Sequence, residues 1–296
     1  MKKGIRKTVA LLLGAALGAT LLVGCGSKKA GGNIVVASKG FTESYILAEL
    51  YADALEGAGY TVERKYDLSA PHDFLGTGEI DIYPEYTSTI VLNYLDGELP
   101  SSEEEIYQKV KNQEAEKYNN EVLNVTTVND KTCLVILKST ADQYGIKTIS
   151  DLQKNSQGWK LADFYGWSER PDNLPKLESL YGSFGFELVD IDAGLKYDAL
   201  SQGEVDVIPG NTTEAQLLET DKYVVLEENI AIWPDYYVVP VVRGDFYKEH
   251  TDVADVINAI DSKLSTEIVQ DLIKQVDVDG KEFEDVAAEF YANNSK

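Results

Sequence analysis

The sequence has few residues that could bind a metal ion or form disulfides. Its 296 residues include only two histidines, His72 and His250, and two cysteines, Cys25 and Cys133. A zinc site needs three or four such side chains at defined spacing, and this inventory cannot supply them. We therefore expect no metal site, and a fold that is stabilised by a large hydrophobic core instead of by disulfides.

Motifs of catalysis and cofactor binding are also missing. The chain has no Gly-rich phosphate loop, no G-x-S-x-G nucleophile elbow and no H-E-x-x-H pair. Residues 277–280 (DVDG) match the start of a calcium loop, but the later ligands are absent, so a turn before the last helix is predicted. We expect no cofactor and no catalytic residue. The enzymatic alternative is a hydrolase that uses carboxylate side chains in a cleft.

Basic residues are scarce compared with acidic ones. Lysine and arginine number 27 against 50 aspartates and glutamates, which gives a formal net charge of −23. Such a chain lacks the basic surface that nucleic acid requires. It is also repelled by an anionic lipid surface, so any membrane attachment has to be covalent or inserted.

The first 25 residues are typical of a bacterial lipoprotein signal peptide. Four basic residues precede an apolar run at 8–23, which is shorter than the roughly 20 residues of a membrane-spanning helix. The run ends in Leu-Val-Gly-Cys, which resembles a lipobox with Cys25 as the lipidated residue. A plain secretory signal with an incidental cysteine is the alternative. Residues 26–32 then predict a flexible tether.

The body of the chain alternates between strand and helix patterns. Residues 33–38 form an apolar run that predicts a first strand, and Thr42 can cap the helix that follows. Gly57 and Gly59 are expected to end this helix, and residues 60–64 alternate like a second strand. A strand, helix and strand in this order predict a parallel pair and an α/β fold.

A five-residue pattern occurs twice and organises the rest of the chain. Gly-Glu-Ile-Asp-Ile at 78–82 is followed by Gly-Glu-Val-Asp-Val at 203–207, so each half is expected to contain an equivalent α/β unit. An apolar strand at 233–242 and three C-terminal helices are expected to return to the first unit. We therefore predict two lobes joined by two crossings. Lobe I would comprise residues 33–129 plus 236–296, and lobe II residues 130–235.

Several segments occur in an order that is typical of one family. They are residues 38–47, 78–87, 170–175, 194–200, 234–240 and 276–281. Together they resemble the substrate-binding lipoproteins of ABC importers for osmoprotectants such as glycine betaine, choline and carnitine. The resemblance implies a two-lobe type II periplasmic-binding fold with the ligand in the interlobe cleft, and no catalysis. It also implies an ABC transporter permease as partner and an extracytoplasmic location at the cell membrane, held by the lipid anchor.

The ligands of this family explain which residue types their sites need. A quaternary ammonium has no N–H to donate, so aromatic faces bind it through cation–π attraction of about 0.5–2 kcal/mol per contact. A carboxylate needs arginine, lysine, hydroxyl or backbone N–H donors. The resemblance implies the following ligand contacts: Tyr86 and either Tyr236 or Tyr237 as cage faces, Thr89 as a polar neighbour, Arg170 for the carboxylate, and Lys39 and Phe41 at the opening turn.

Two positions depart from the family pattern. The family commonly has tyrosine where this chain has Cys133 and Asn211. These changes would enlarge and polarise the pocket, while Trp167 could replace the lost ring area. Another zwitterion, such as an aromatic amino-acid betaine, is therefore the alternative ligand. Cys133 lies in an apolar strand-like run and is expected to be a small buried hydrophobe.

Structural roles remain open for three of these residues. Tyr86 could be a core aromatic, Trp167 could serve ordinary packing, and Arg170 could form a surface ion pair.

Overall fold

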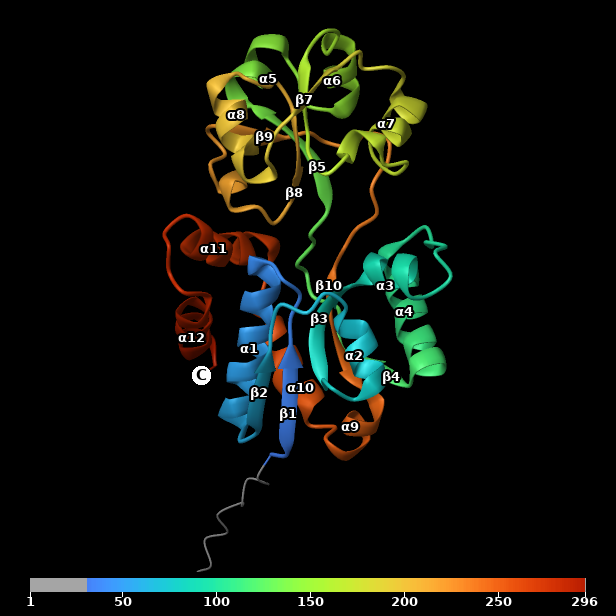
Figure 1. Ribbon diagram of the computed structural model, residues 1–296, viewed down its shortest axis with the longest axis vertical. Helices are drawn as coiled ribbons and strands as arrows, with labels where there is room; N and C mark the ends of the chain where they lie inside the picture. Colours follow the sequence, from blue (N-terminus) through green and yellow to red (C-terminus); the bar gives the residue numbers. More distant parts are fainter. Residues whose placement is uncertain (1–30, 296) are drawn as a thin grey trace, which may run out of the picture. The chain divides into compact units, whose positions relative to one another are not determined.

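A five-stranded sheet forms the centre of the first lobe in the computed structural model, which describes residues 31–295 (Figure 1). The strand order is β2-β1-β3-β10-β4, with β1 parallel to β2 and β3, and β10 antiparallel to β3 and β4. The strands are β1 (Asn33–Ala37), β2 (Thr61–Lys65), β3 (Ile82–Tyr86), β4 (Asn120–Val122) and β10 (Val238–Arg243). We call the part of the chain built on this sheet lobe I.

Helices cover both faces of this sheet (Figure 1). One group is α1 (Thr42–Ala58), α10 (Val253–Asp261), α11 (Thr266–Asp277) and α12 (Phe283–Asn294); the other is α2 (Pro71–Thr77), α3 (Thr87–Asn93) and α4 (Glu103–Tyr118), while α9 (Gly244–Glu249) follows β10. Val238 and Val242 of β10 pack with the first group, whereas Val239 and Val241 pack with the second. This alternation follows from the two-residue period of a strand, so lobe I has two cores separated by one sheet.

Helix α1 is the most deeply buried helix of the first group. It packs against α10, α11 and α12, and residues such as Ile46, Leu47 and Leu50 are fully buried. Burying each such side chain stabilises the fold by about 1.5–3 kcal/mol relative to leaving it exposed. The start of α1, which carries several residues of the candidate site, is therefore firmly held.

The second lobe repeats the strand order of the first. Strand β5 lies between β8 and β9, antiparallel to both, and β6 runs parallel to β7. A parallel bridge between Leu161 and Val207 joins these groups, so the order reads β7-β6-β8-β5-β9. The elements of this part, which we call lobe II, are β5 (Thr132–Leu137), α5 (Lys138–Tyr144), α6 (Ile149–Asn155), β6 (Lys160–Asp163), α7 (Leu174–Tyr181), β7 (Glu187–Asp190), α8 (Lys196–Gln202), β8 (Ile208–Asn211) and β9 (Tyr223–Val225).

The repeated five-residue pattern occupies equivalent places in the two lobes. In both copies the glycine ends a helix, α2 or α8, in the left-handed conformation. In lobe I the carboxylate of Asp81 accepts the backbone N–H of Val35 at 2.8 Å, and in lobe II the carboxylate of Asp206 accepts that of Lys160 at 2.8 Å. Because Val35 lies on β1 and Lys160 on β6, each aspartate fixes the corresponding strand. The equivalence predicted from the sequence is confirmed.

The beginning and end of α1 differ from the prediction. Thr42 does not cap the helix: Phe41 is the N-cap residue, and the Thr42 hydroxyl donates to Asp277 at 2.7 Å instead. The helix runs through Gly57 and ends only at Gly59, whose φ of 99° suits glycine. The Thr42 side chain therefore ties the start of α1 to the last residue of α11.

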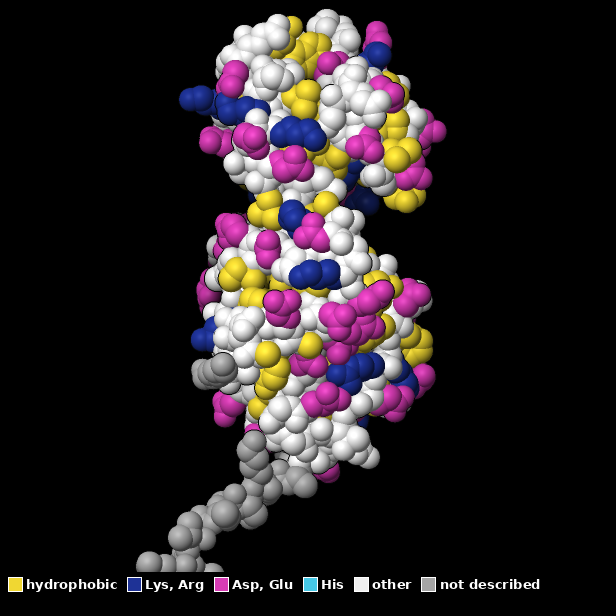
Figure 2. All heavy atoms as spheres, turned by 90° about the vertical axis from the view of Figure 1, so that its left-hand side faces the viewer, with side chains coloured by type: hydrophobic (Ala, Val, Ile, Leu, Met, Phe, Trp, Pro, Cys, Tyr) yellow, Lys and Arg dark blue, Asp and Glu magenta, His cyan; other side chains and the backbone are white. Residues whose placement is uncertain are grey.

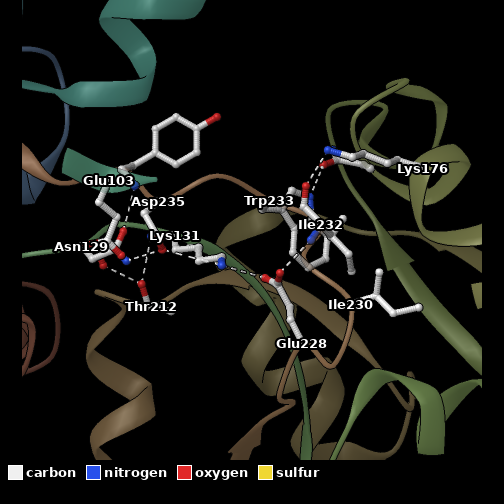
Figure 3. Close-up of polar contacts among 12 residues, drawn as sticks. Glu103, Asn129, Lys131, Lys176, Thr212, Glu228, Ile230, Ile232, Trp233 and Asp235 are labelled. Atoms are coloured by element: carbon white, nitrogen blue, oxygen red, sulfur yellow. Dashed lines mark hydrogen bonds and ion pairs between the residues drawn. The ribbon is translucent and has the colours of Figure 1, made fainter. Parts of the chain in front are cut away.

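Two short segments, near Asn129 and near Asp235, pass from one lobe to the other. The Asn129 amide donates to the Asp235 carboxylate at 2.8 Å, and Lys131 pairs with Glu228 at 3.2 Å and with Asp235 at 3.6 Å (Figure 3). Because residues 233–237 belong to this crossing, the strand predicted at 233–242 begins only at Val238. The crossings are thus linked side by side through their own polar side chains.

The predicted signal peptide and lipobox lie outside the described residues, as does the tether up to residue 30. Within residues 31–295, no helix is both long and apolar enough to span a membrane. Aspartate and glutamate side chains are spread widely over the face of the molecule seen in Figure 2, as the net charge of −23 requires.

Candidate ligand-binding site

Two cavities of opposite charge contain several of the predicted site residues. The first, of about 230 Å³, is lined by residues of both lobes, among them Phe41, Glu43, Asp130, Asn211, Thr213 and Glu214. The second, of about 270 Å³, is lined by lobe II residues, among them Phe164, Tyr165, Trp167, Arg170, Lys196 and Asn211. We call them the acidic cavity and the aromatic cavity. Asn211 lines both, so the two cavities adjoin at this residue.

Two carboxylates, Glu43 and Asp130, dominate the acidic cavity. Glu43 is buried at the start of α1 and accepts a hydrogen bond from the Tyr86 hydroxyl at 2.6 Å. Asp130 accepts the Thr213 hydroxyl at 2.7 Å and the Asn211 amide at 3.2 Å. Burial raises the pKa of Glu43 to about 8, and the nearby Asp130 charge adds to that rise. A cation placed here would lower the pKa of Glu43 and allow it to ionise beside Asp130.

Tyr86 lies directly behind the residues that line this cavity. Its side chain is buried, with 6% exposure, and its ring centroid is 6.4 Å from that of Phe41. The Lys39 ammonium lies 5.3 Å from the centre of the same ring and forms an ion pair with the fully buried Glu85. Lys39 is therefore engaged within the protein, where it offsets the charge of Glu85, and it lines neither cavity.

The aromatic cavity contains two cationic side chains, Arg170 and Lys196. The Arg170 side chain is 62% exposed and donates twice to Asp172, from Nε at 3.2 Å and from Nη2 at 2.7 Å. A guanidinium has five N–H donors, so three remain after this pairing. Lys196 pairs with Glu214 and lies 5.2 Å from the centre of the Phe164 ring. Positive charge beside an aromatic wall suits a carboxylate-bearing ligand.

Trp167 combines a packing role with a place on the cavity wall. Only 8% of it is exposed, and its ring lies 6.3 Å from that of Trp233 in the core of lobe II. The buried Asn173 links the two, because it accepts the Trp233 indole N–H and donates to the Trp167 carbonyl, each at 3.2 Å. Trp167 therefore contributes a rigidly held side chain to the wall of the aromatic cavity.

The two neighbouring tyrosines of the crossing point to different partners. The Tyr237 hydroxyl donates to Glu103 at the start of α4 at 3.1 Å. Burial raises the pKa of Tyr236, and Asp172 adds to the rise while Arg170 opposes it, which places Tyr236 beside the Arg170–Asp172 pair. Neither tyrosine lines either cavity, and of the two it is Tyr236 whose pKa is affected by Arg170 and Asp172.

The remaining predicted positions have clear places in the fold. Thr89 lies half-buried in the first turn of α3 and lines neither cavity. Cys133 is buried on β5 opposite Gly210, and burial raises the pKa of its thiol, as expected for a small hydrophobe. In sum, the structure brings four predicted residues onto the cavity walls: Phe41, Trp167, Arg170 and Asn211.

Several cavity residues were not predicted from the sequence. Glu43 and Asp130 are separated by 86 residues, and in a chain with 50 acidic residues no carboxylate stands out by its type. Lys196 lies within residues 194–200, a segment that resembles the family, and this resemblance could have indicated it as a site residue. Tyr165 belongs to residues 165–170, a segment that the sequence predicts on the wall of the cleft, although no role follows for this residue individually.

Residues 32–293 match the family described as the substrate binding domain of the ABC-type glycine betaine transport system. The chain belongs to this family. Its members are substrate-binding components of ABC transporters and not enzymes, so the predicted absence of catalysis is confirmed.

Relatives of this glycine betaine transport family align along nearly the whole described chain. The glycine-betaine-binding protein of Pseudomonas aeruginosa is 30% identical over 271 residues, which cover 86% of each chain. The ergothioneine transport permease/ergothioneine binding protein EgtU of Helicobacter pylori is 29% identical over 261 residues, covering 87% of this chain. That alignment covers 47% of EgtU, so the chain spans about half the length of this relative.

Solved structures show that this family member has the predicted two-lobe fold. A crystal structure of a glycine betaine/carnitine/choline ABC transporter protein superposes with a TM-score of 0.81 at 24% identity, covering 88% of this chain and 98% of that one. Ligand-free YehZ from Escherichia coli superposes with a TM-score of 0.73 at 23% identity, covering 88% and 98%. The fold class predicted from the sequence, a two-lobe α/β periplasmic-binding protein, is confirmed.

Glu43→Gln is expected to make the free energy of unfolding depend less on pH. The folded-state pKa of Glu43, about 8, lies above its ordinary value of 4.5, so folding is favoured by a bound proton. The contribution of this proton to the free energy of unfolding is complete below about pH 4.5 and is lost as the pH rises through about 8. Glutamine stays neutral and avoids this loss. Urea unfolding at several pH values between 5 and 9 measures how steeply the free energy of unfolding changes with pH.

The exposed Glu204→Gln serves as the control for this charge change and should keep the wild-type slope. Burial also raises the pKa of Asp261 to about 8. The free energy of unfolding of Glu43→Gln should therefore still fall with rising pH, but less steeply. If the free energy of unfolding of Glu43→Gln changed with pH as steeply as that of wild type, the raised pKa assigned to Glu43 would be contradicted.

Proposed function

We propose that this chain is the extracytoplasmic receptor of an ABC importer and that it binds a betaine-type zwitterion, delivering it to the transporter permease. The observation that carries the proposal is the pairing of an acidic and a basic aromatic cavity that meet at Asn211. A zwitterion has its two charges at opposite ends, so it matches this arrangement, whereas a simple cation or anion matches only half of it.

The cationic end is assigned to the acidic cavity. Asp130 and Glu43 are the acidic groups, and a bound cation would favour the ionised form of Glu43, whose pKa is raised to about 8. Phe41 lines the wall, and Tyr86 supports both Glu43 and Phe41 from behind. A quaternary ammonium is large and weakly hydrated, and aromatic faces with nearby carboxylates attract it without needing an N–H donor. The aromatic cage predicted from the sequence is thus proposed in a modified form, with carboxylates beside the rings.

The carboxylate end is assigned to the aromatic cavity. Arg170 has three N–H donors that Asp172 does not use, and Lys196 adds a second cation on the same wall. Tyr236, next to the Arg170–Asp172 pair, and the Asn211 amide supply further polar groups. Lys39, Thr89 and Tyr237 are proposed as supporting residues of the site instead of ligand contacts.

A second candidate ligand is an aromatic amino-acid betaine. The aromatic cavity has three ring-bearing residues, Phe164, Tyr165 and Trp167, which exceeds what a trimethylated glycine needs. A relative at 29% identity is named for ergothioneine, a betaine with a sulfur-substituted imidazole ring. The small side chain of Asn211, which lines both cavities, also favours a bulkier ligand. Glycine betaine and carnitine remain the first candidates, while choline, which has no carboxylate, matches the acidic cavity alone.

A thermal-shift panel tests the proposed function. Glycine betaine, carnitine, choline and ergothioneine are each added to the purified protein, with glycine and histidine as unmethylated controls. A ligand present at 100 times its Kd stabilises the fold by about 2.7 kcal/mol and raises Tm. We expect at least one methylated zwitterion to raise Tm more than choline, which has no carboxylate. No shift with any methylated compound would contradict the proposal.

Lobe closure is proposed as the conformational change that accompanies binding. The proposed lobe boundaries are those of the sequence prediction, 33–129 plus 236–296 and 130–235. They are supported by the linked crossings at Asn129 and Asp235 (Figure 3). Hinge closure of two lobes around a ligand is how periplasmic binding proteins commonly act. Closure would bring further groups of lobe I against the aromatic cavity.

We also propose that the protein is held at the membrane by lipid on Cys25. Cys25→Ala is expected to release the protein into the soluble fraction with its ligand binding intact, because residues 31–295 contain no helix able to span a membrane. Fractionation after a salt wash measures the release. Cys133→Ala, which changes the buried cysteine, should stay with the membrane. A Cys25→Ala protein retained after the wash would contradict lipid anchoring.

A further inference from the structure

A tight turn in lobe II carries a residue that its backbone does not favour. The Trp167 N–H donates to the Phe164 carbonyl at 3.0 Å, which closes a turn over residues 164–167. Its two central residues, Tyr165 and Gly166, have φ values of 52° and 67°. Positive φ at both central positions is the pattern of a type I′ turn, which favours asparagine, aspartate and glycine. Tyr165 therefore occupies a strained backbone position.

Packing does not explain the tyrosine either. Tyr165 is 90% exposed, and its contact with a neighbouring ring is an edge approach to Phe164 at 6.1 Å between centroids. The turn itself is braced independently of that ring, since Asp163 accepts hydrogen bonds from the backbone N–H and the hydroxyl of Ser168. A bulky aromatic residue thus stands in a strained, exposed position that other contacts hold in place. Such outliers concentrate at ligand sites.

The turn places Tyr165 on the wall of the aromatic cavity. Arg170 and Lys196, the proposed carboxylate partners, line the same cavity, and so does Asn211, which adjoins the acidic cavity. The Phe164 ring on one side of Tyr165 is engaged by Lys196 at 5.2 Å. The Tyr165 ring is thus an exposed aromatic surface next to the place where a ligand would lie.

We propose that Tyr165 is a ligand-covering residue that determines specificity: its ring lies over the bound ligand in the aromatic cavity and retains it. This inference rests on the proposed function and deepens it. The ring provides an apolar, polarisable face for an aromatic ring carried by the ligand next to its carboxylate. Because a cover acts mainly after the ligand has entered, its removal raises the dissociation rate more than it lowers the association rate.

The test compares Tyr165→Gly and Tyr165→Phe with wild type, using ergothioneine and glycine betaine as probes. Calorimetry gives Kd, stopped-flow fluorescence gives the dissociation rate, and thermal unfolding gives the ligand-free Tm. We expect Tyr165→Gly to raise the Kd of ergothioneine by about five- to thirty-fold, the equivalent of one lost aromatic contact, and to raise that of glycine betaine, which carries no ring, by less. Its ligand-free Tm should be unchanged or higher, since glycine accepts the positive φ. Tyr165→Phe should keep most of the affinity.

A matched control is Tyr144→Ala, because Tyr144 is another exposed tyrosine of lobe II, with its ring 5.3 Å from that of Trp159, and it lies outside both cavities. It should leave both Kd values unchanged. A Tyr165→Gly protein with wild-type Kd and dissociation rate would overturn the inference while leaving the proposed function in place. Wild-type protein that binds neither probe, nor any other methylated compound of the thermal-shift panel, would overturn both. A purely structural role would lower Tm without this selective change in dissociation.

Discussion

Arg170→Ala is expected to weaken binding of carboxylate-bearing ligands by about ten- to hundred-fold and to leave choline nearly unaffected. The physical reason is that charge-assisted hydrogen bonds contribute about 1.5–3 kcal/mol, and choline has no carboxylate to accept them. Arg170 is well placed to lose only this interaction, because its side chain is 62% exposed and lies outside the lobe II core. Calorimetric titration of glycine betaine and choline into both proteins measures the contrast.

Asp172→Asn is the matched control for this substitution. It weakens the pairing that occupies two of the Arg170 donors, so carboxylate ligands should bind as well as, or better than, they bind to wild type. Equal losses for choline and glycine betaine in Arg170→Ala would show that Arg170 shapes lobe II and does not contact the carboxylate.

Tyr86→Ala is expected to weaken choline and glycine betaine to a similar extent, by about 1–2 kcal/mol or more, because both carry the quaternary ammonium. The substitution removes the ring behind Phe41 and the donor that orients Glu43. Tyr86→Phe keeps the ring and should lose less, about 1 kcal/mol for the hydroxyl, although it leaves the buried Glu43 without this donor. Calorimetry at pH 7 measures the three proteins.

Two further measurements make the Tyr86 result specific. Ligand-free Tm separates loss of binding from loss of folding, since Tyr86 is buried in the lobe I core. Tyr237→Phe is the control, because the Tyr237 hydroxyl donates a hydrogen bond to Glu103. This variant should keep nearly wild-type affinity. A Tyr86→Ala protein that binds both ligands as tightly as wild type would remove the cationic end from the acidic cavity.

Much of the fold followed from local patterns in the sequence. The Gly-Glu-x-Asp-x repeat predicted equivalent units because glycine ends a helix and aspartate can accept the N–H of a neighbouring strand, and both lobes show this pair of interactions. The failures were equally local. Thr42 looked like a helix cap, but the distant Asp277 takes its hydroxyl, a tertiary contact that no pattern around residue 42 reveals.

The candidate site was harder to predict because its chemistry comes from residues far apart in the chain. Family resemblance identified Arg170 and Asn211 as cavity residues, yet it gave no sign that Lys39 is already paired with Glu85. The choice between Tyr236 and Tyr237 also required coordinates. They are adjacent in a non-repetitive segment, where no periodicity says which side chain faces Arg170.

A crystal structure of the protein with its strongest ligand from the thermal-shift panel would test the central claim most directly. We expect the trimethylammonium group to lie in the acidic cavity beside Glu43 and Asp130, within about 6 Å of an aromatic ring centroid. We expect the carboxylate in the aromatic cavity, hydrogen-bonded to Arg170. A ligand bound in the reverse orientation, or in the groove between α11 and α12, would contradict the assignment of the two ends.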